Sequence, residues 1–186
     1  MAVPHPKIAI TGDIGSGKSE VCRLLAAATG YPTYSTGQMQ REIADRLGMT
    51  TLELNRYSES HPEIDQEIDG RSMELGGRDE SFLIDSRIAW RFIPQSFKVF
   101  LSVDLRTAAE RILGAGRRRE RYASLDDAMR DIGRRRRSEN ERFLETYGID
   151  QSDLGNYDLV VDTSDKTPGQ VADEILGAFR AWRDAA

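Results

Sequence analysis

A glycine-rich segment at residues 12–19 limits the possible folds of this chain more than any other feature. It reads GDIGSGKS and matches the pattern G-x-x-x-x-G-K-[ST] at every fixed position. The apolar run 7–11 before it is typical of a buried strand, and helical spacing begins at Gly17. A loop of this kind between a strand and a helix predicts an α/β protein that holds a phosphate chain at the end of its first strand.

The same loop predicts a site for ATP and Mg²⁺. Glycines allow several backbone N–H groups to turn inward, where they and the N-terminus of the following helix hold phosphate oxygens. Lys18 would contact the β- and γ-phosphates, and the Ser19 hydroxyl would bind Mg²⁺. The predicted ATP-binding residues are Gly12, Asp13, Ile14, Gly15, Ser16, Gly17, Lys18 and Ser19.

Apolar strands alternate with amphipathic helices along the rest of the chain. We expect strands at 7–11, 31–34, 81–85, 98–103 and 157–162. We expect helices at 17–29, 37–47, 104–113, 124–147 and 168–182, and two more that begin near residue 50 and at residue 62. This alternation predicts an α/β fold of the P-loop NTPase type, a three-layer sandwich with a five-stranded parallel sheet.

The length of the chain predicts a single domain, residues 1–186. A helical insertion would occupy residues from about 36 to 76, and an arginine-rich lid would occupy about 114–148. The core of the domain would then consist of residues 1–35, 77–113 and 149–186.

Composition and charge argue against several classes of partner. The formal net charge of −5 is too acidic for a dedicated nucleic-acid binder. No apolar run is long enough for a signal peptide or a membrane span. The single cysteine, Cys22, cannot form an internal disulfide and is expected in the core. We therefore expect a cytoplasmic monomer that binds neither a membrane nor nucleic acid.

Two charged residues that follow predicted strands are candidates for the site. Asp85 ends a buried strand, where such folds place an acidic residue that holds Mg²⁺, although a strand-end Asp can also cap a turn or pair with Arg87. Arg41 lies one helical turn into the segment after the second strand, which directs it back towards the loop. It could hold the phosphate that accepts the transferred group, or it could be a solvated surface arginine, as we expect for Arg46.

The arginine run 134–137, followed by Arg142, is the most unusual local feature of the sequence. Arginines on a closing segment would neutralise the charge of a phosphoryl group in transfer while the segment excludes water. Helical periodicity places Arg135 and Arg142 on one face, so they are the predicted catalytic residues together with Lys18, and Arg134 is a weaker candidate. The alternatives are an exposed charged helix or a basic surface for nucleic acid.

Short segments spread over nearly the whole chain match one known family. They are the phosphate loop, STG at 35–37, HPEID at 61–65, LIDSRIAW at 83–90, SEN at 138–140, YGID at 147–150 and NYDLVVDT at 156–163. On these segments the chain resembles the short cytidylate kinases of archaea and bacteria, a branch of the nucleoside monophosphate kinases. The resemblance implies transfer of the γ-phosphoryl group of ATP to CMP or dCMP, with a requirement for Mg²⁺.

The resemblance also implies roles for particular residues. The monophosphate acceptor would lie in a binding domain formed by residues 36–76. Its implied ligands are Thr36, Arg41 and Arg87. Arg135 and Arg142 are implied for the mobile lid. Asp85 is implied to support the metal.

Two positions depart from the family pattern, and two other functions stay open on the sequence. Ser86 stands where many relatives have Gly, and Ile88 stands where the longer bacterial enzymes have an Asp that helps to hold the nucleoside. One alternative is a P-loop kinase of another nucleoside monophosphate or small-molecule acceptor. The other is a non-catalytic, nucleotide-dependent RNA-binding module with residues 117–142 as its basic contact surface.

Overall fold

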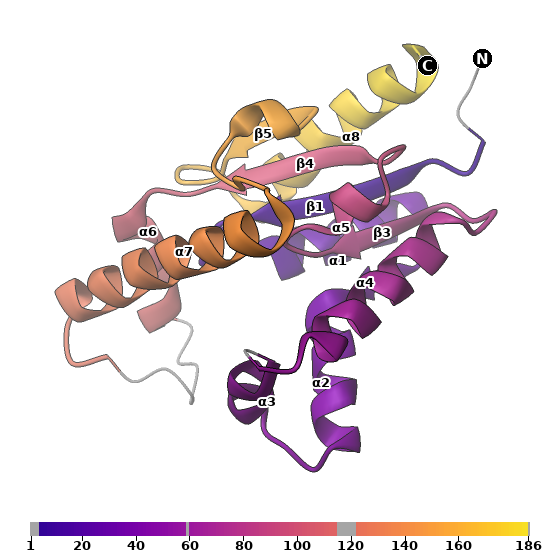
Figure 1. Ribbon diagram of the computed structural model, residues 1–186. Coiled ribbons are helices and arrows are strands. Elements are labelled where there is room, and N and C mark those ends of the chain that lie inside the picture. The colour runs from indigo at the N-terminus through magenta and orange to yellow at the C-terminus, as the bar shows by residue number, and fades with distance from the viewer. Residues whose placement is uncertain (1–3, 59, 115–121, 186) are drawn as a thin grey trace.

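Five parallel strands form one sheet in the order β2-β3-β1-β4-β5 (Figure 1). The computed structural model describes residues 4–58, 60–114 and 122–185. The strands are β1 (Lys7–Gly12), β2 (Thr33–Ser35), β3 (Phe82–Asp85), β4 (Phe97–Ser102) and β5 (Leu159–Asp162). Every neighbouring pair is parallel, which confirms the predicted five-stranded parallel sheet.

Helices connect the strands and cover both faces of the sheet. They are α1 (Lys18–Thr29), α2 (Thr36–Arg46), α3 (Thr51–Ser58), α4 (Pro62–Gly76), α5 (Ala89–Phe92), α6 (Leu105–Gly114), α7 (Leu125–Tyr147) and α8 (Pro168–Ala185). A single 3₁₀ turn, η1 (Leu154–Asn156), precedes β5. All the predicted helices are present within a few residues of their expected bounds, whereas α5 and η1 are elements that the sequence patterns did not predict.

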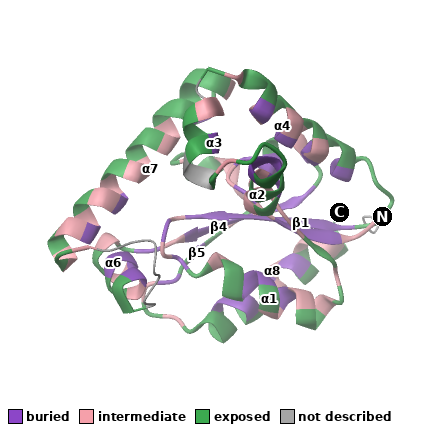
Figure 2. Ribbon diagram, turned by 90° about the horizontal axis from the view of Figure 1, so that it is seen from below, coloured by how far each residue is buried: buried purple, intermediate pink, exposed green. Residues whose placement is uncertain are grey.

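The sheet separates two apolar cores. Ile8 and Ile10 of β1 belong to one core and Ala9 to the other, because successive side chains of a strand point to opposite faces. Helices α1 and α8 pack on the first face, while α2 and α4 pack on the second, and the molecule therefore has three layers (Figure 2). Cys22 is buried in the first core, as expected.

Local hydrogen bonds explain where several helices begin. The Ser124 hydroxyl caps α7 by accepting a hydrogen bond from the backbone N–H of Asp127 at 3.1 Å. Thr50 and Glu53 form a reciprocal capping box before α3, in which the Glu53 carboxylate accepts from the Thr50 N–H at 2.7 Å. The Asp104 carboxylate caps α6 by accepting a hydrogen bond from the Thr107 N–H at 2.9 Å. Each of these caps lies at the start of a helix that the sequence predicts.

Helices α2, α3 and α4 form the insertion between β2 and β3, and they lie on the same side of the sheet as α7, opposite α1 and α8 (Figure 2). Ion pairs join α2 to α4, Arg46 to Glu67 at 2.5 Å and Arg71 to Glu42 at 3.1 Å. The predicted lid includes α7, but its residues 115–121 lie outside the described residues. None of the helices in the described part of the chain combines the length and the apolar character needed to cross a bilayer.

Candidate active site

The phosphate loop joins β1 to α1 and packs tightly against neighbouring elements. The backbone N–H of Asp13 donates to the carbonyl of Leu101 at 2.9 Å. A Cβ atom at Gly12 would lie 2.5 Å from the same carbonyl oxygen, and one at Gly15, where φ is +85°, would lie 2.8 Å from the Cα of Ala108. Packing therefore requires glycine at both positions, including Gly15, which the consensus pattern leaves free.

Lys18 is the first residue of α1, and its ammonium lies against the loop. Its Nζ donates to the carbonyl oxygen of Gly12 at 3.0 Å. Burial lowers the pKa of Lys18 to about 8; the nearby Arg87 acts in the same direction, and Asp85 opposes it. Because bound phosphate would favour the charged ammonium, this side chain is suited to a strongly anionic ligand.

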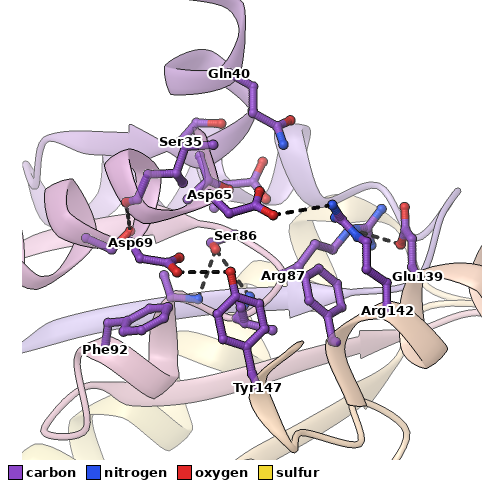
Figure 3. Close-up of a pocket in the computed structure, with 18 of the residues that line it drawn as sticks. Ser35, Gln40, Asp65, Asp69, Ser86, Arg87, Phe92, Glu139, Arg142 and Tyr147 are labelled. Carbon is purple, nitrogen blue, oxygen red and sulfur yellow. Dashed lines mark hydrogen bonds and ion pairs between the residues drawn. The ribbon is translucent and has the colours of Figure 1, made fainter. Parts of the chain in front are cut away.

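One cavity of about 540 Å³ lies between the phosphate loop, the helical insertion and α7 (Figure 3). It is lined by seven of the fourteen residues that the sequence predicts for the site. Those that line it are Lys18, Ser19, Thr36, Arg41, Asp85, Arg87 and Arg142. They come from four separate segments of the chain, which the parallel sheet gathers because the carboxyl ends of its strands share one edge.

The turn after β3 places Arg87 at the centre of these elements. The buried Ser86 hydroxyl accepts hydrogen bonds from the N–H groups of Ile88 and Ala89, at 3.3 and 2.9 Å, and so caps the short helix α5. The Arg87 guanidinium donates to the Gly12 carbonyl at 2.6 Å and pairs with Glu139 of α7 at 3.4 Å. Ser86 therefore stabilises the turn between β3 and α5.

The arginines of α7 lie in different environments. Arg142 lines the cavity, whereas Arg134 is exposed and pairs with Asp131. Arg135 is half-buried on the same helix and is not among the described residues that line the cavity. Helical periodicity favoured Arg135 and Arg142, yet Arg136 also reaches the phosphate loop.

Arg136 joins α7 to the outer side of the loop. Its guanidinium donates to the backbone carbonyls of Ile14 and Val103, at 3.3 and 3.2 Å, and lies 3.4 Å from the Asp13 carboxylate. The same carboxylate accepts from the N–H of Val103 at 3.2 Å. Burial raises the pKa of Asp13, and Arg136 is the largest of the effects that lower it. These contacts link α7 directly to the phosphate loop.

Acidic and aromatic side chains form the other side of the cavity. The Tyr147 hydroxyl at the end of α7 donates to the Asp69 carboxylate of α4 at 2.9 Å, and Asp65 lies 3.9 Å from Arg142 (Figure 3). Phe92 of α5 lines the same space. No sequence pattern assigns a role to Asp65 or Asp69, because acidic positions along a helix are usually solvated.

The donors near the phosphate loop fit a magnesium ion that is held mainly by a nucleotide. Mg²⁺ in such sites takes one or two protein oxygens, and phosphate and water oxygens complete its shell. Ser19 and Asp85 supply a hydroxyl and a carboxylate to one cavity. The described residues contain no group of three or more His, Cys, Asp or Glu side chains that could hold a metal by themselves.

The parallel sheet, the phosphate loop and the adjoining cavity together define a P-loop kinase. The family model for the cytidylate kinase-like family matches residues 7–165, and the chain therefore belongs to this family. The cytidylate kinase of Thermoplasma volcanium is 37% identical over 174 residues, which cover 91% of this chain and 89% of the relative. That of Sulfolobus acidocaldarius is 38% identical over 175 residues, 93% of each chain.

Solved structures with low sequence identity share the fold. A crystal structure of an uncharacterized protein from Eubacterium ventriosum superposes with a TM-score of 0.69 at 19% identity and covers 94% of this chain and 98% of that one. Shikimate kinase from Aquifex aeolicus gives a TM-score of 0.58 at 18% identity, with 94% and 96% covered. At these identities the likeness shows the architecture alone.

Proposed function

We propose that this protein transfers the γ-phosphoryl group of ATP to CMP or dCMP, giving CDP or dCDP and ADP. One observation carries the proposal: Lys18 of the phosphate loop shares a cavity with Arg41 and Arg87, on the side where an acceptor would enter. The family relationship supports the same reaction, since its curated members from several archaea are named cytidylate kinases.

The phosphate loop would bind the donor. Inward-facing N–H groups at residues 12–19 would hold the phosphate oxygens, and the Lys18 ammonium would contact the β- and γ-phosphates. Ser19 and Asp85 would hold Mg²⁺, which would neutralise charge on the phosphate groups when bound. Arg136 keeps the loop in place from outside through its contacts with Asp13 and the Ile14 carbonyl.

Arginines would hold the acceptor in line with the donor. Arg41, Thr36 and Arg87 line the cavity beside Lys18, and a guanidinium can grip a phosphate through two parallel hydrogen bonds. Phosphoryl transfer needs little covalent chemistry from the protein, because positioning and charge stabilisation supply most of the rate. Arg142, and Arg135 after closure of the lid, would face the phosphoryl group in transfer.

An acceptor panel tests the proposal. Purified protein is incubated with ATP and Mg²⁺ and with CMP, dCMP, UMP, AMP or GMP in turn, and the diphosphate products are separated by chromatography. We expect CMP and dCMP to be the best acceptors by kcat/KM. Turnover of another acceptor with failure of both cytidine nucleotides would overturn the assignment.

A matched pair of lysine variants shows that the activity belongs to this protein. Lys18→Met removes the ammonium from the phosphate loop and should lower turnover by on the order of 10²-fold or more. Lys98→Met makes the same change on β4, and Lys98 is not among the described residues that line the cavity. Turnover that survived in both variants would indicate a contaminating kinase.

A further inference from the structure

Asp69 lies in the part of the cavity that the phosphate-binding residues leave open. In Figure 3, Asp69, Phe92 and Tyr147 gather on one side, whereas Arg87, Glu139 and Arg142 lie on the other. All of them line the same space. An acceptor whose phosphate contacts the arginines would therefore extend its other end towards Asp69.

The Asp69 carboxylate retains hydrogen-bonding capacity in this position. An ionised carboxylate offers about four acceptor positions on its two oxygens and no donor. Tyr147 occupies one of them through its 2.9 Å hydrogen bond to Oδ2, and within the described chain this is the only hydrogen bond made by the Asp69 side chain. Burial also raises the pKa of Asp69 and that of Tyr147, as expected for groups removed from water.

Apolar and aromatic groups line the same cavity as the carboxylate and suit a planar ring. Ile68 precedes Asp69 and lines the cavity together with Phe92 and Phe143. The rings of Phe92 and Tyr147 are 6.1 Å apart between centroids at 80°. A flat heterocycle can pack against such walls while its polar edge meets the carboxylate.

We propose that Asp69 makes the site selective for cytosine over uracil, by accepting a hydrogen bond from the exocyclic amine at position 4 of the ring, and that Tyr147 is a positioning residue which holds this carboxylate in place. The inference rests on the proposed function and extends it to the choice of base. Cytosine offers an N–H donor at this position, and carboxylates pair with it in other complexes. Uracil carries a carbonyl oxygen there. This oxygen and the carboxylate are both hydrogen-bond acceptors, so they could not form a hydrogen bond with each other.

Asp65 and Asp69 have different partners within the protein. Asp65 lies one turn earlier on α4 and faces the Arg142 guanidinium at 3.9 Å, so its charge has a cationic partner within the protein. Asp69 has the neutral Tyr147 hydroxyl as its partner. The Asp69 carboxylate is therefore the one that can contact a neutral hydrogen-bond donor on a ligand.

The test compares CMP with UMP as acceptors for wild type and for Asp69→Asn, by kcat/KM with ATP saturating. The wild type should prefer CMP. The asparagine can turn its NH₂ group towards the uracil oxygen, and the loss of a charge-assisted hydrogen bond should lower the CMP-to-UMP ratio by roughly 10- to 100-fold. Tyr147→Phe should lower the ratio by a smaller factor, because the carboxylate stays but is no longer held.

Glu63→Gln is the matched control. It removes one negative charge from the exposed side of the same helix, and Glu63 is not among the described residues that line the cavity. Its ratio should equal that of the wild type. Circular dichroism melting curves show whether each variant is folded.

The outcomes separate the inference from the function on which it rests. If the wild type phosphorylates CMP and Asp69→Asn keeps the wild-type ratio, the inference is wrong and the proposed function stands. An equal loss with both acceptors would assign Asp69 to the ribose or to the fold, and would also overturn the inference. A wild type that phosphorylates neither CMP nor dCMP would overturn both.

Discussion

Lys18 should titrate within an accessible pH range. Burial lowers its pKa from the ordinary 10.5 to about 8, with Arg87 acting in the same direction and Asp85 and Glu139 opposing. Bound phosphates stabilise the charged ammonium, so the affinity for ATP should be full below this pKa and should fall as the pH rises through it, by up to about tenfold per pH unit. The measurement is the dissociation constant of Mg²⁺–ATP at intervals from about pH 7.5 to 9.5.

Lys18→Arg provides the control for this pH dependence. A guanidinium remains charged over the whole range, so the variant should show a flat profile whatever its absolute affinity. A wild-type affinity that stays constant up to pH 9.5 would contradict the prediction. An equal slope in both proteins would assign the titration to another group.

At the scale of single residues, the sequence predicted the phosphate side of the cavity better than the side that would hold a base. Lys18 and Ser19 follow from the loop pattern, whose chemistry is local in sequence. The contact between Asp69 and Tyr147 joins residues 78 positions apart. Because nothing near either residue marks the other, only the folded arrangement of α4 and α7 identifies the pair.

Among the elements, α7 contacts three different parts of the molecule around the cavity. It contacts the phosphate loop through Arg136, the turn after β3 through Glu139 and the helical insertion through Tyr147. Its start at Ser124 and its length were predictable from a cap and from helical spacing. The face that meets the loop was not, since that depends on how the helix lies across the sheet.

The link between α7 and the loop yields a prediction about ATP affinity. Arg136→Ala would leave the Asp13 carboxylate and two backbone carbonyls without their cationic partner, beside the place where phosphates bind. We expect KM for ATP to rise by roughly 10-fold or more, while KM for the acceptor changes little. Initial-rate kinetics with each substrate varied in turn provide the measurement.

The adjacent arginine serves as the control. Arg137 is exposed and does not line the cavity among the described residues, so Arg137→Ala removes the same charge from the same helix without touching the loop. A similar rise in KM for both variants would mean that the general positive charge of α7, and not this contact, supports ATP binding.

The short helix α5 shows why some elements escape sequence analysis. Ala89–Phe92 is too short to display periodicity, and its start depends on the Ser86 hydroxyl, whose position is fixed by the end of β3. The longer helices and the strands have enough apolar residues to reveal their period. The packing of the chain therefore determines the position of α5, which the local sequence pattern does not reveal.

For the whole molecule, the arrangement of insertion, loop and α7 around one cavity predicts joint stabilisation by the two substrates. A ligand that binds only the folded state adds about 2.7 kcal/mol at 100 times its dissociation constant. A non-hydrolysable ATP analogue with Mg²⁺ and CMP together should therefore raise Tm more than either alone. Calorimetric melting curves measure the shifts, and the absence of any further shift on adding CMP would contradict a shared cavity.

The parallel sheet also gives the molecule two unequal ends. Because all the strands run the same way, the phosphate loop, the turn after β3 and the start of the insertion emerge at one end. The start of β1 and the last turn of α8 lie towards the opposite end (Figure 1). A tether or a fused domain joined ahead of β1 or after α8 would therefore start on the side away from the cavity and leave the route of the nucleotides unobstructed.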